Sequence, residues 1–255
     1  MLNPALSLGR YFPDDQPPQT PADVAVVIPT IMRPSILQAV KCVYGQEGAG
    51  HVQLAIGTDI NFQNTAELYA LLAERPAHVS ALVLTLPYST SVRHGGVHRA
   101  LDSGALRSIL SYAANARRVA YLDDDNIWTP DHLASLQAAV EGKGWAFSQR
   151  MLIDEETGAE IAVDRWDSVG PDKGRMAEEG GFVDTNCLLV DKLAAADVFG
   201  YWSEPGLNKP SFRGDRRFFR ALRELPYGVV ERPTVRYGIR SNNMLHKFIR
   251  EGVEF

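Results

Sequence analysis

Residues 24–28 read Val-Ala-Val-Val-Ile and are followed by Pro29 and Thr30. A short, uninterrupted and β-branched apolar run of this kind is typical of a strand buried on both faces. Such burial occurs where helices cover both faces of a parallel sheet. The run therefore predicts a central strand of an α/β domain, which Pro29 brings to an end.

The segments that follow alternate between helix and strand patterns. Further strands are predicted at residues 52–57, at 79 and 81–86, and at 119–122, and helices are predicted to begin at Pro34, Asn64, Leu106 and Thr129. Asn64 and Glu67 have the spacing of a capping box, and Thr129-Pro130 fits an N-cap followed by a first-turn proline. This alternation predicts an α/β fold with a mainly parallel central sheet flanked by helices.

The second half of the chain is less regular. Strands are predicted at residues 145–151 and 182–190, a turn at 154–158, and helices at 191–198 and 215–222. No linker separates the halves, so residues 23–255 are predicted to form a single domain. Residues 1–22 are rich in proline and predict an extended N-terminal arm.

Composition narrows the class of protein. The 255 residues are 45% hydrophobic and 22% charged, which is typical of a globular chain. The net charge is −5 and the basic residues are scattered, which disfavours a nucleic-acid partner. Cys42 and Cys187 lie in apolar runs and are expected to be buried free thiols. Neither a signal-peptide pattern nor a run of 18 apolar residues is present, so a cytoplasmic protein without a transmembrane segment is expected.

Three acidic residues, Asp123, Asp124 and Asp125, directly follow the fourth predicted strand. Ligands of open parallel sheets bind outside the carboxyl ends of the strands. Adjacent carboxylates repel one another unless a cation lies among them, and Mg²⁺ or Mn²⁺ commonly bridges carboxylates to the phosphates of a substrate. The run therefore predicts a cation site that stabilises a diphosphate leaving group. The alternative is a solvated acidic turn that caps the next helix.

Three stretches then resemble the inverting family-2 glycosyltransferases, which have the GT-A (Rossmann-like) fold. Residues 122–131 (Leu-Asp-Asp-Asp-Asn-Ile-Trp-Thr-Pro-Asp) are similar to the DXD region of that family. Residues 26–30 resemble its first strand and nucleotide loop, and residues 214–219 resemble the segment that carries its catalytic base. Within the family, the acidic run and residues 214–219 are similar to the bacterial spore-coat polysaccharide glycosyltransferase.

The resemblance implies an activity and roles for individual residues. It implies transfer of a sugar from a nucleotide diphosphate sugar, with UDP as the first expectation, to a saccharide or other hydroxyl acceptor, with Mn²⁺ or Mg²⁺ as cofactor. Residues 23–130 would form the nucleotide-binding half and residues 131–255 an elaborated acceptor-side half. The implied roles are nucleotide binding for Thr30, Asp59, Asp123 and Asp124, metal binding for Asp125, and general-base catalysis for Asp215.

A basic residue that contacts the nucleotide is also implied before the fourth strand. Arg93, His94, His98 and Arg99 all lie in that region, and Arg99 is preferred among them.

Three further residues have competing interpretations. Asp184 is predicted to line the donor or acceptor pocket, or else to form a hydrogen-bonded turn before a strand. Trp202 is predicted to stack on a sugar ring, because aromatic faces suit apolar sugar faces, or else to pack in the core. His246 is predicted to complete the metal shell, with a structural or solvated histidine as the alternative.

Two other functions use the same acidic run. A nucleotidyltransferase or phosphatase is one, although the DxD signature of haloacid-dehalogenase-like phosphatases follows the first strand, whereas Asp123 follows the fourth. A non-catalytic module that binds nucleotide sugars is the other. The sequence also leaves open whether the chain forms a homo-oligomer.

Overall fold

The computed structural model describes residues 7–12, 19–59, 65–99, 103–204 and 214–239. The strands are β1 (Ser7–Tyr11), β2 (Val24–Thr30), β3 (Val52–Thr58), β4 (Val79–Thr85), β5 (Arg118–Tyr121), β6 (Ile127–Trp128), β7 (Trp145–Asp154), β8 (Glu160–Val163), β9 (Gly170–Pro171), β10 (Gly181–Phe182), β11 (Leu188–Asp191) and β12 (Tyr227–Ile239). The α-helices are α1 (Ile36–Tyr44), α2 (Thr65–Ala73), α3 (Gly104–Ala113), α4 (His132–Ala139) and α5 (Gly214–Leu222). The short 3₁₀ turns are η1 (Val92–His94), η2 (Gly174–Glu179), η3 (Thr185–Cys187) and η4 (Phe199–Trp202).

One large sheet has the strand order β1-β4-β3-β2-β5-β11-β7-β12-β6, and β8 pairs with β7 beside this path. Strands β4, β3, β2 and β5 are parallel neighbours, and β7 and β12 are a second parallel pair. Strand β11 lies between the two groups and is antiparallel to both β5 and β7. The predicted α/β fold with a mainly parallel sheet is therefore confirmed.

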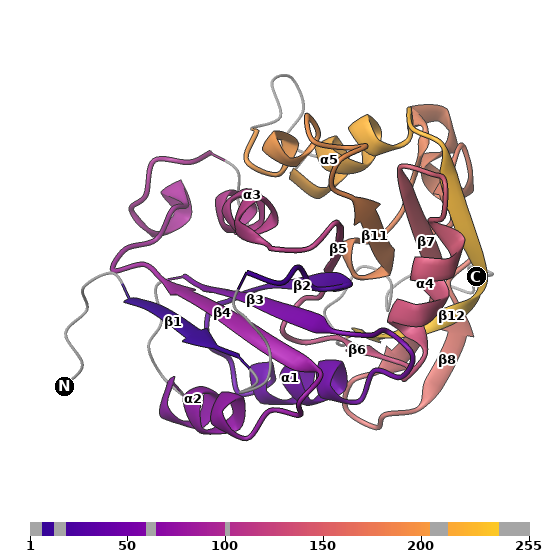
Figure 1. Cartoon of the computed structure of the whole chain (residues 1–255). Helices are drawn as coiled ribbons and strands as arrows, with labels where there is room; N and C mark the ends of the chain where they lie inside the picture. The colour runs from indigo at the N-terminus through magenta and orange to yellow at the C-terminus, as the bar shows by residue number, and fades with distance from the viewer. Residues whose placement is uncertain (1–6, 13–18, 60–64, 100–102, 205–213, 240–255) are drawn as a thin grey trace.

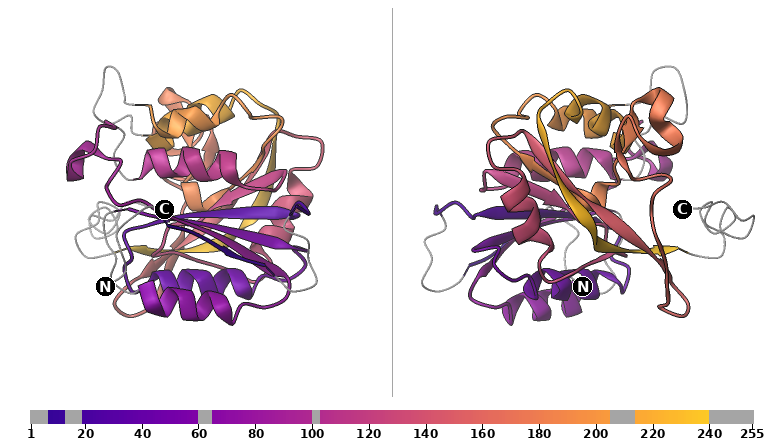
Figure 2. Two further views of the ribbon diagram at one scale, coloured as in Figure 1. Left: turned by 60° about the vertical axis from the view of Figure 1, so that its left-hand side comes forward. Right: turned by 90° about the vertical axis from the view of Figure 1, so that its right-hand side faces the viewer.

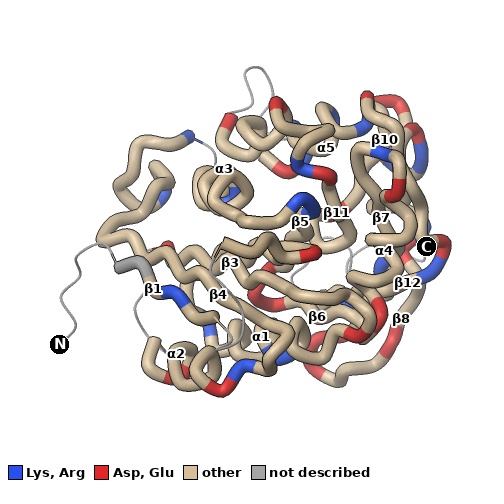
Figure 3. Tube along the Cα trace, in the orientation of Figure 1, with Lys and Arg blue, Asp and Glu red and all other residues tan. Residues whose placement is uncertain are grey.

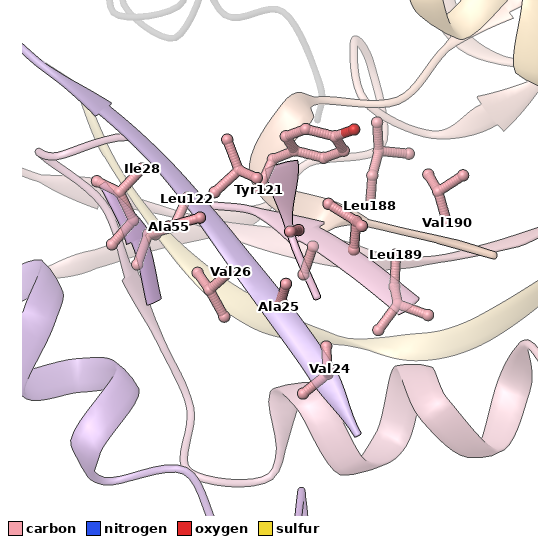
Figure 4. Packing of buried hydrophobic residues seen from close by; sticks show 14 of the residues in the cluster. Val24, Ala25, Val26, Ile28, Ala55, Tyr121, Leu122, Leu188, Leu189 and Val190 are labelled. Carbon is pink, nitrogen blue, oxygen red and sulfur yellow. The ribbon is translucent and has the colours of Figure 1, made fainter. Parts of the chain in front are cut away.

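Helices cover both faces of this sheet. Figure 1 shows α1 and α2 together on one side of the parallel strands and α3 on the other, with α5 beyond it, and both views of Figure 2 agree. Every residue of β2 and β3 is buried, as the central-strand pattern predicts. Figure 4 shows the core where β2, β3, β5 and β11 meet, and this core places the carboxyl ends of β2, β3 and β5 along one edge.

Several local expectations differ from the structure. The described part of the proline-rich arm contains β1, which pairs antiparallel with β4 as the edge strand. Residues 182–190 are not one strand, because η3 interrupts the run before β11. Residues 192–198 form turns rather than an α-helix. Helix α4 begins at His132 rather than at Thr129, whose Oγ1 instead donates a hydrogen bond to Asp131 Oδ1 at 2.7 Å.

The remaining global expectations concern cysteines, membranes and charge. Cys42 is half-buried, Cys187 is buried, and both are free thiols. Among the described helices, none has the length and apolar character needed to cross a bilayer. Figure 3 shows acidic and basic positions spread around the molecule rather than gathered on one side.

Candidate active site

A pocket of about 430 Å³ opens at the carboxyl ends of β2, β3 and β5. The ends of these strands are held in register, because Asp59 N donates to Thr30 O at 2.8 Å and Leu122 N donates to Val27 O at 3.1 Å. The lining consists of Pro29, Thr30, Ile31, Arg33, Asp59, Ser91, Arg93, His94, Ser103, Arg107, Asp123, Asp124, Asp125, Asn126, Glu155, Tyr237 and Gly238. The pocket is thus mainly polar and lies where open parallel sheets bind ligands.

Asp124 is the most deeply anchored of the three acidic residues. Thr30 Oγ1 donates a hydrogen bond to Asp124 Oδ2 at 2.6 Å and accepts one from Met32 N at 2.7 Å. Burial raises the pKa of Asp124, while the Thr30 hydrogen bond and the charge of Arg33 oppose that rise. Thr30 and Asp124, both predicted nucleotide contacts, therefore form one fixed unit between β2 and β5.

Two arginines that the sequence analysis did not single out balance the acidic run. Arg33 Nη1 donates to Asp124 Oδ1 at 3.2 Å and to Asp125 Oδ2 at 3.0 Å. Arg107, on α3, forms an ion pair with Asp123 Oδ1. Arg33 could have been found from its position in the loop after the first strand. Arg107 could not, because only the packing of α3 brings it to the pocket.

Asp59 lies on the β3 side of the same pocket and is buried. Its Oδ2 accepts a hydrogen bond from Ser89 Oγ at 3.1 Å. Its Oδ1 is buried without a hydrogen-bond partner among the described residues. A buried acceptor of this kind calls for a donor, such as a ligand or water.

The four basic residues considered for the nucleotide contact differ in their position relative to the pocket. All four side chains are exposed, but Arg93 and His94, in η1, line the pocket, whereas His98 and Arg99 do not belong to the described lining. Arg99 is therefore a poorer candidate for the nucleotide contact than Arg93, contrary to the sequence-based preference. The spacing of the segment gave no basis for this distinction, because the loop conformation decides which side chains face inward.

Asp184 lies behind the acidic run instead of in the pocket lining. Asn186 Oδ1 accepts a hydrogen bond from Asp123 N at 2.6 Å, and its Nδ2 donates to Asp123 Oδ2 at 3.0 Å and to Asp184 Oδ1 at 2.8 Å. Asp184 Oδ2 accepts from Arg150 Nη1 at 2.7 Å. Burial raises the pKa of Asp184, and the Arg150 charge opposes this effect. Asp184 thus supports Asp123 through Asn186.

Arg150 is the centre of this supporting layer. Its fully buried guanidinium forms ion pairs with Asp164 at 2.7 Å, with Asp167 at 3.1 Å and with Asp184. It also lies 4.2 Å from the ring centroid of Tyr237, which lines the pocket. Removal of any one of these partners would leave a buried charge unpaired, which is strongly unfavourable. The intact cluster therefore holds the pocket wall in place.

Trp202 belongs to the core. Its indole is 1% exposed and stacks on Phe218 at 4.0 Å between ring centroids. Arg107 lies over the same indole, 5.3 Å from its centroid. The expected stacking of Trp202 on a sugar is therefore replaced by the core-packing alternative, in which the ring supports Arg107.

Asp215 occupies the first turn of α5 and accepts a hydrogen bond from Arg216 N at 2.8 Å. It is outside the described pocket lining, although the charges of Arg107 and Asp123 act on its pKa. Burial is the main cause that raises this pKa. The carboxylate therefore lies close enough to the acidic run to be influenced by it, on the side of α3 and α5. His246 lies outside the described residues.

No family model matches the chain, and no curated protein matches its sequence. Solved structures, in contrast, match the chain in fold. TarS of S. aureus, a glycosyltransferase, has the same fold. The similarity has a TM-score of 0.62 at 12% identity and covers 90% of this chain but only 38% of the TarS chain.

Structures of TarS residues 1–349 give the same result. The complex with UDP aligns with a TM-score of 0.61 at 12% identity, covering 86% of this chain and 61% of that one. The complex with UDP-GlcNAc aligns with a TM-score of 0.59 at 12% identity, covering 88% and 60%. The chain thus spans less than two thirds of TarS. The similarity to TarS supports a glycosyltransferase fold and is no evidence for the spore-coat family.

Proposed function

We propose that the chain is a glycosyltransferase that moves a sugar from a nucleotide diphosphate sugar, with UDP as the preferred nucleotide, to an acceptor hydroxyl. The observation that carries this proposal is the polar pocket at the carboxyl ends of β2, β3 and β5, with Asp124 fixed by Thr30 in its floor. The fold shared with TarS, for which complexes with UDP and UDP-GlcNAc are known, supports it.

Asp59 is suited to the base end of the nucleotide. It lies in the pocket, and its buried Oδ1 lacks a partner among the described residues. A ring N–H of a base would supply the missing donor. Arg93 and His94 on η1 face the same pocket and supply positive charge or hydrogen-bond donors for phosphate oxygens.

A divalent cation at the acidic run is part of the proposal. Asp124 Oδ1 and Asp125 Oδ2 are both within 3.2 Å of one cationic nitrogen, Arg33 Nη1, so the two carboxylates are already oriented to share a positive charge. Their oxygens are the ligand type that Mn²⁺ and Mg²⁺ prefer. No three His, Cys, Asp or Glu side chains within the described ranges form a metal cluster. Asp124 and Asp125 would therefore hold the ion together with donor phosphates and water, and the bound ion would neutralise the departing diphosphate.

We assign the general base to Asp215, with inversion at the anomeric carbon. In this reaction the acceptor oxygen forms a bond to the anomeric carbon while the bond to the diphosphate oxygen breaks, and Asp215 takes the proton of the acceptor hydroxyl. The raised pKa of Asp215 strengthens it as a base, provided that it is deprotonated at the working pH. Its position on the α3 and α5 side agrees with an acceptor that approaches opposite the nucleotide.

Thermal unfolding with nucleotides tests the donor and the cation together. UDP with Mn²⁺ should raise the unfolding temperature, because a ligand at 100 times its dissociation constant adds about 2.7 kcal/mol of stability. ADP, GDP and UMP with Mn²⁺ serve as comparisons, and UDP with EDTA tests the cation. Release of UDP from a UDP-sugar, with and without candidate acceptors, then measures the reaction. A chain that gains no stability from any nucleoside diphosphate and releases none would not have this function.

A further inference from the structure

Arg33 occupies the position between two carboxylates where a cation would lie. Its Nη1 is 3.2 Å from Asp124 Oδ1 and 3.0 Å from Asp125 Oδ2, and the side chain itself is 43% exposed. The Asp124 side chain is 7% exposed and is held by Thr30. The Asp124 carboxylate is thus anchored, while the guanidinium that bridges it to Asp125 remains accessible from the pocket.

The backbone conformation of the preceding residue fixes the position of the Arg33 main chain. The preceding residue, Met32, is buried and adopts a left-handed conformation with φ of 60°. Its N–H donates to Thr30 Oγ1, the same atom that holds Asp124. A non-glycine residue keeps such a conformation only when its surroundings enforce it. The loop after β2 therefore presents Arg33 from a rigid base, and only its side chain has to move.

From this geometry we propose that Arg33 and the divalent cation compete for the carboxylates of Asp124 and Asp125, and that Arg33 turns to the diphosphate of the donor when the cation binds. The inference rests on the proposed function, which supplies both the cation and the diphosphate. Two cations cannot share the same two carboxylate oxygens without strong repulsion. A displaced guanidinium lies in the pocket, where its planar donors match phosphate oxygens.

Replacement of Arg33 by a divalent cation at Asp124 and Asp125 would also keep the charges of the pocket balanced. In the structure, Arg33 and Arg107 offset most of the charge of the three acidic residues. When a divalent cation takes over Asp124 and Asp125, the positive charge of Arg33 becomes available for the incoming diphosphate. Removal of Arg33 should therefore have opposite effects on the two ligands.

The test compares the full chain with its Arg33→Gln variant. Titration with Mn²⁺ followed by electron paramagnetic resonance, without nucleotide, should show Mn²⁺ binding about tenfold tighter in the variant. Calorimetric titration with UDP at saturating Mn²⁺ should show UDP binding about tenfold weaker. Arg118→Gln is the matched control, because it removes the same charge from an ion pair with Glu141 at the other end of β5 and should change neither affinity.

Arg33→Lys provides a second variant that keeps the charge. It should bind Mn²⁺ much as the wild type does, because the competing cation remains, and should bind UDP more weakly than the wild type, because the planar fork is lost. If Arg33→Gln leaves Mn²⁺ affinity unchanged or weaker, or leaves UDP affinity unchanged, the inference is wrong. If the wild type nevertheless binds UDP with Mn²⁺, that result contradicts only the role of Arg33 and leaves the proposed function standing. If the wild type binds neither ligand, the proposed function fails and the inference with it.

Discussion

At the scale of single residues, the surroundings of Asp215, the proposed general base, raise the pKa of its carboxyl group. Helix α5 begins so close to η4 that a Cβ on Gly214 would lie 2.3 Å from the carbonyl oxygen of Trp202. Gly214 therefore permits this close contact, and the next residue, Asp215, is half-buried. This partial burial raises the pKa of Asp215, while the hydrogen bond from Arg216 N and the charges of Arg216 and Arg107 oppose the rise.

Asp215→Asn is expected to lower the transfer rate by about 10²-fold or more, because a general base contributes roughly 10²–10⁴-fold. UDP affinity, measured by calorimetry, should remain within about twofold of the wild type, because Asp215 is not among the residues that line the described pocket. The wild-type rate should decline on the acidic side as Asp215 becomes protonated, at a pH above the usual carboxyl range because its pKa is raised. A variant with near wild-type turnover would remove Asp215 from the role of base.

At the scale of elements, β12 brings part of the second half of the chain to the pocket. Strand β12 supplies Tyr237 and Gly238 to the pocket lining, and α4 packs against β12. The contact is tight at Gly228, where an added Cβ would lie 1.9 Å from the backbone oxygen of Ala139. Backbone atoms cannot move aside as a flexible side chain can, so this position excludes larger residues.

Gly228→Ala is expected to destabilise the protein by about 1–3 kcal/mol, the usual cost of overpacking. Urea unfolding followed by circular dichroism measures the change. Gly200→Ala is the matched control, because an added Cβ at Gly200 meets no atom within 4 Å and should have little effect. Equal stabilities of the two variants would show that α4 and β12 are not packed in this way.

His132, at the start of α4, makes the stability of this region dependent on pH. The ring is fully buried, stacks on Trp128 at 4.2 Å, and is 2.6 Å from Thr234 Oγ1 through Nδ1. Burial lowers the pKa of His132 to about 3. The unfolded chain has a His132 pKa of about 6.5, so between these values it binds a proton that the folded chain does not.

The stabilising contribution of neutral His132 is therefore complete above about pH 6.5 and is lost as the pH falls toward about 3, at about 1.4 kcal/mol per pH unit. His132→Asn should remove this contribution, so the difference in unfolding free energy between wild type and variant should shrink from pH 7 to pH 5. Urea unfolding at several pH values measures it, with His98→Asn at an exposed position as the control. A difference that does not change with pH would contradict the prediction.

At the scale of the whole molecule, one hydrophobic core joins the two halves of the chain. The cluster contains Val26 and Leu54 from the first half together with Leu189 and Phe218 from the second. Strand β11 completes the connection, because it pairs with β5 on one side and β7 on the other. A continuous core of this kind favours a single cooperative unfolding transition.

Urea unfolding should accordingly give coincident transitions by tryptophan fluorescence and by far-ultraviolet circular dichroism. Trp128, Trp145 and Trp202 are buried, and the backbone signal reports on both halves. UDP with Mn²⁺, if bound, should move both transitions together. Two separate transitions would mean that the halves unfold independently.

The candidate site was only partly predictable. The three acidic residues were predicted from the strand that they follow, and Thr30 and Asp59 from the family resemblance. The structure brings all five to one pocket, because parallel strands end at one edge. Arg107, Asn186 and Tyr237 were missed, because their elements reach the pocket only through long-range packing. Asp184 and Trp202 were noticed for their chemistry, but the structure places them behind the lining.

The alternation of apolar strands and helices by itself determined the α/β class and the edge at which the acidic residues gather. Local periodicity is sufficient for this, because the direction and burial of each parallel strand follow from its own residues and its crossover helix. Only the tertiary structure decided that β11 joins the two halves, that Arg33 bridges Asp124 and Asp125, and that Arg150 supports Asp123 through Asp184 and Asn186. These contacts join residues distant in the chain, and their formation depends on packing that no local pattern records.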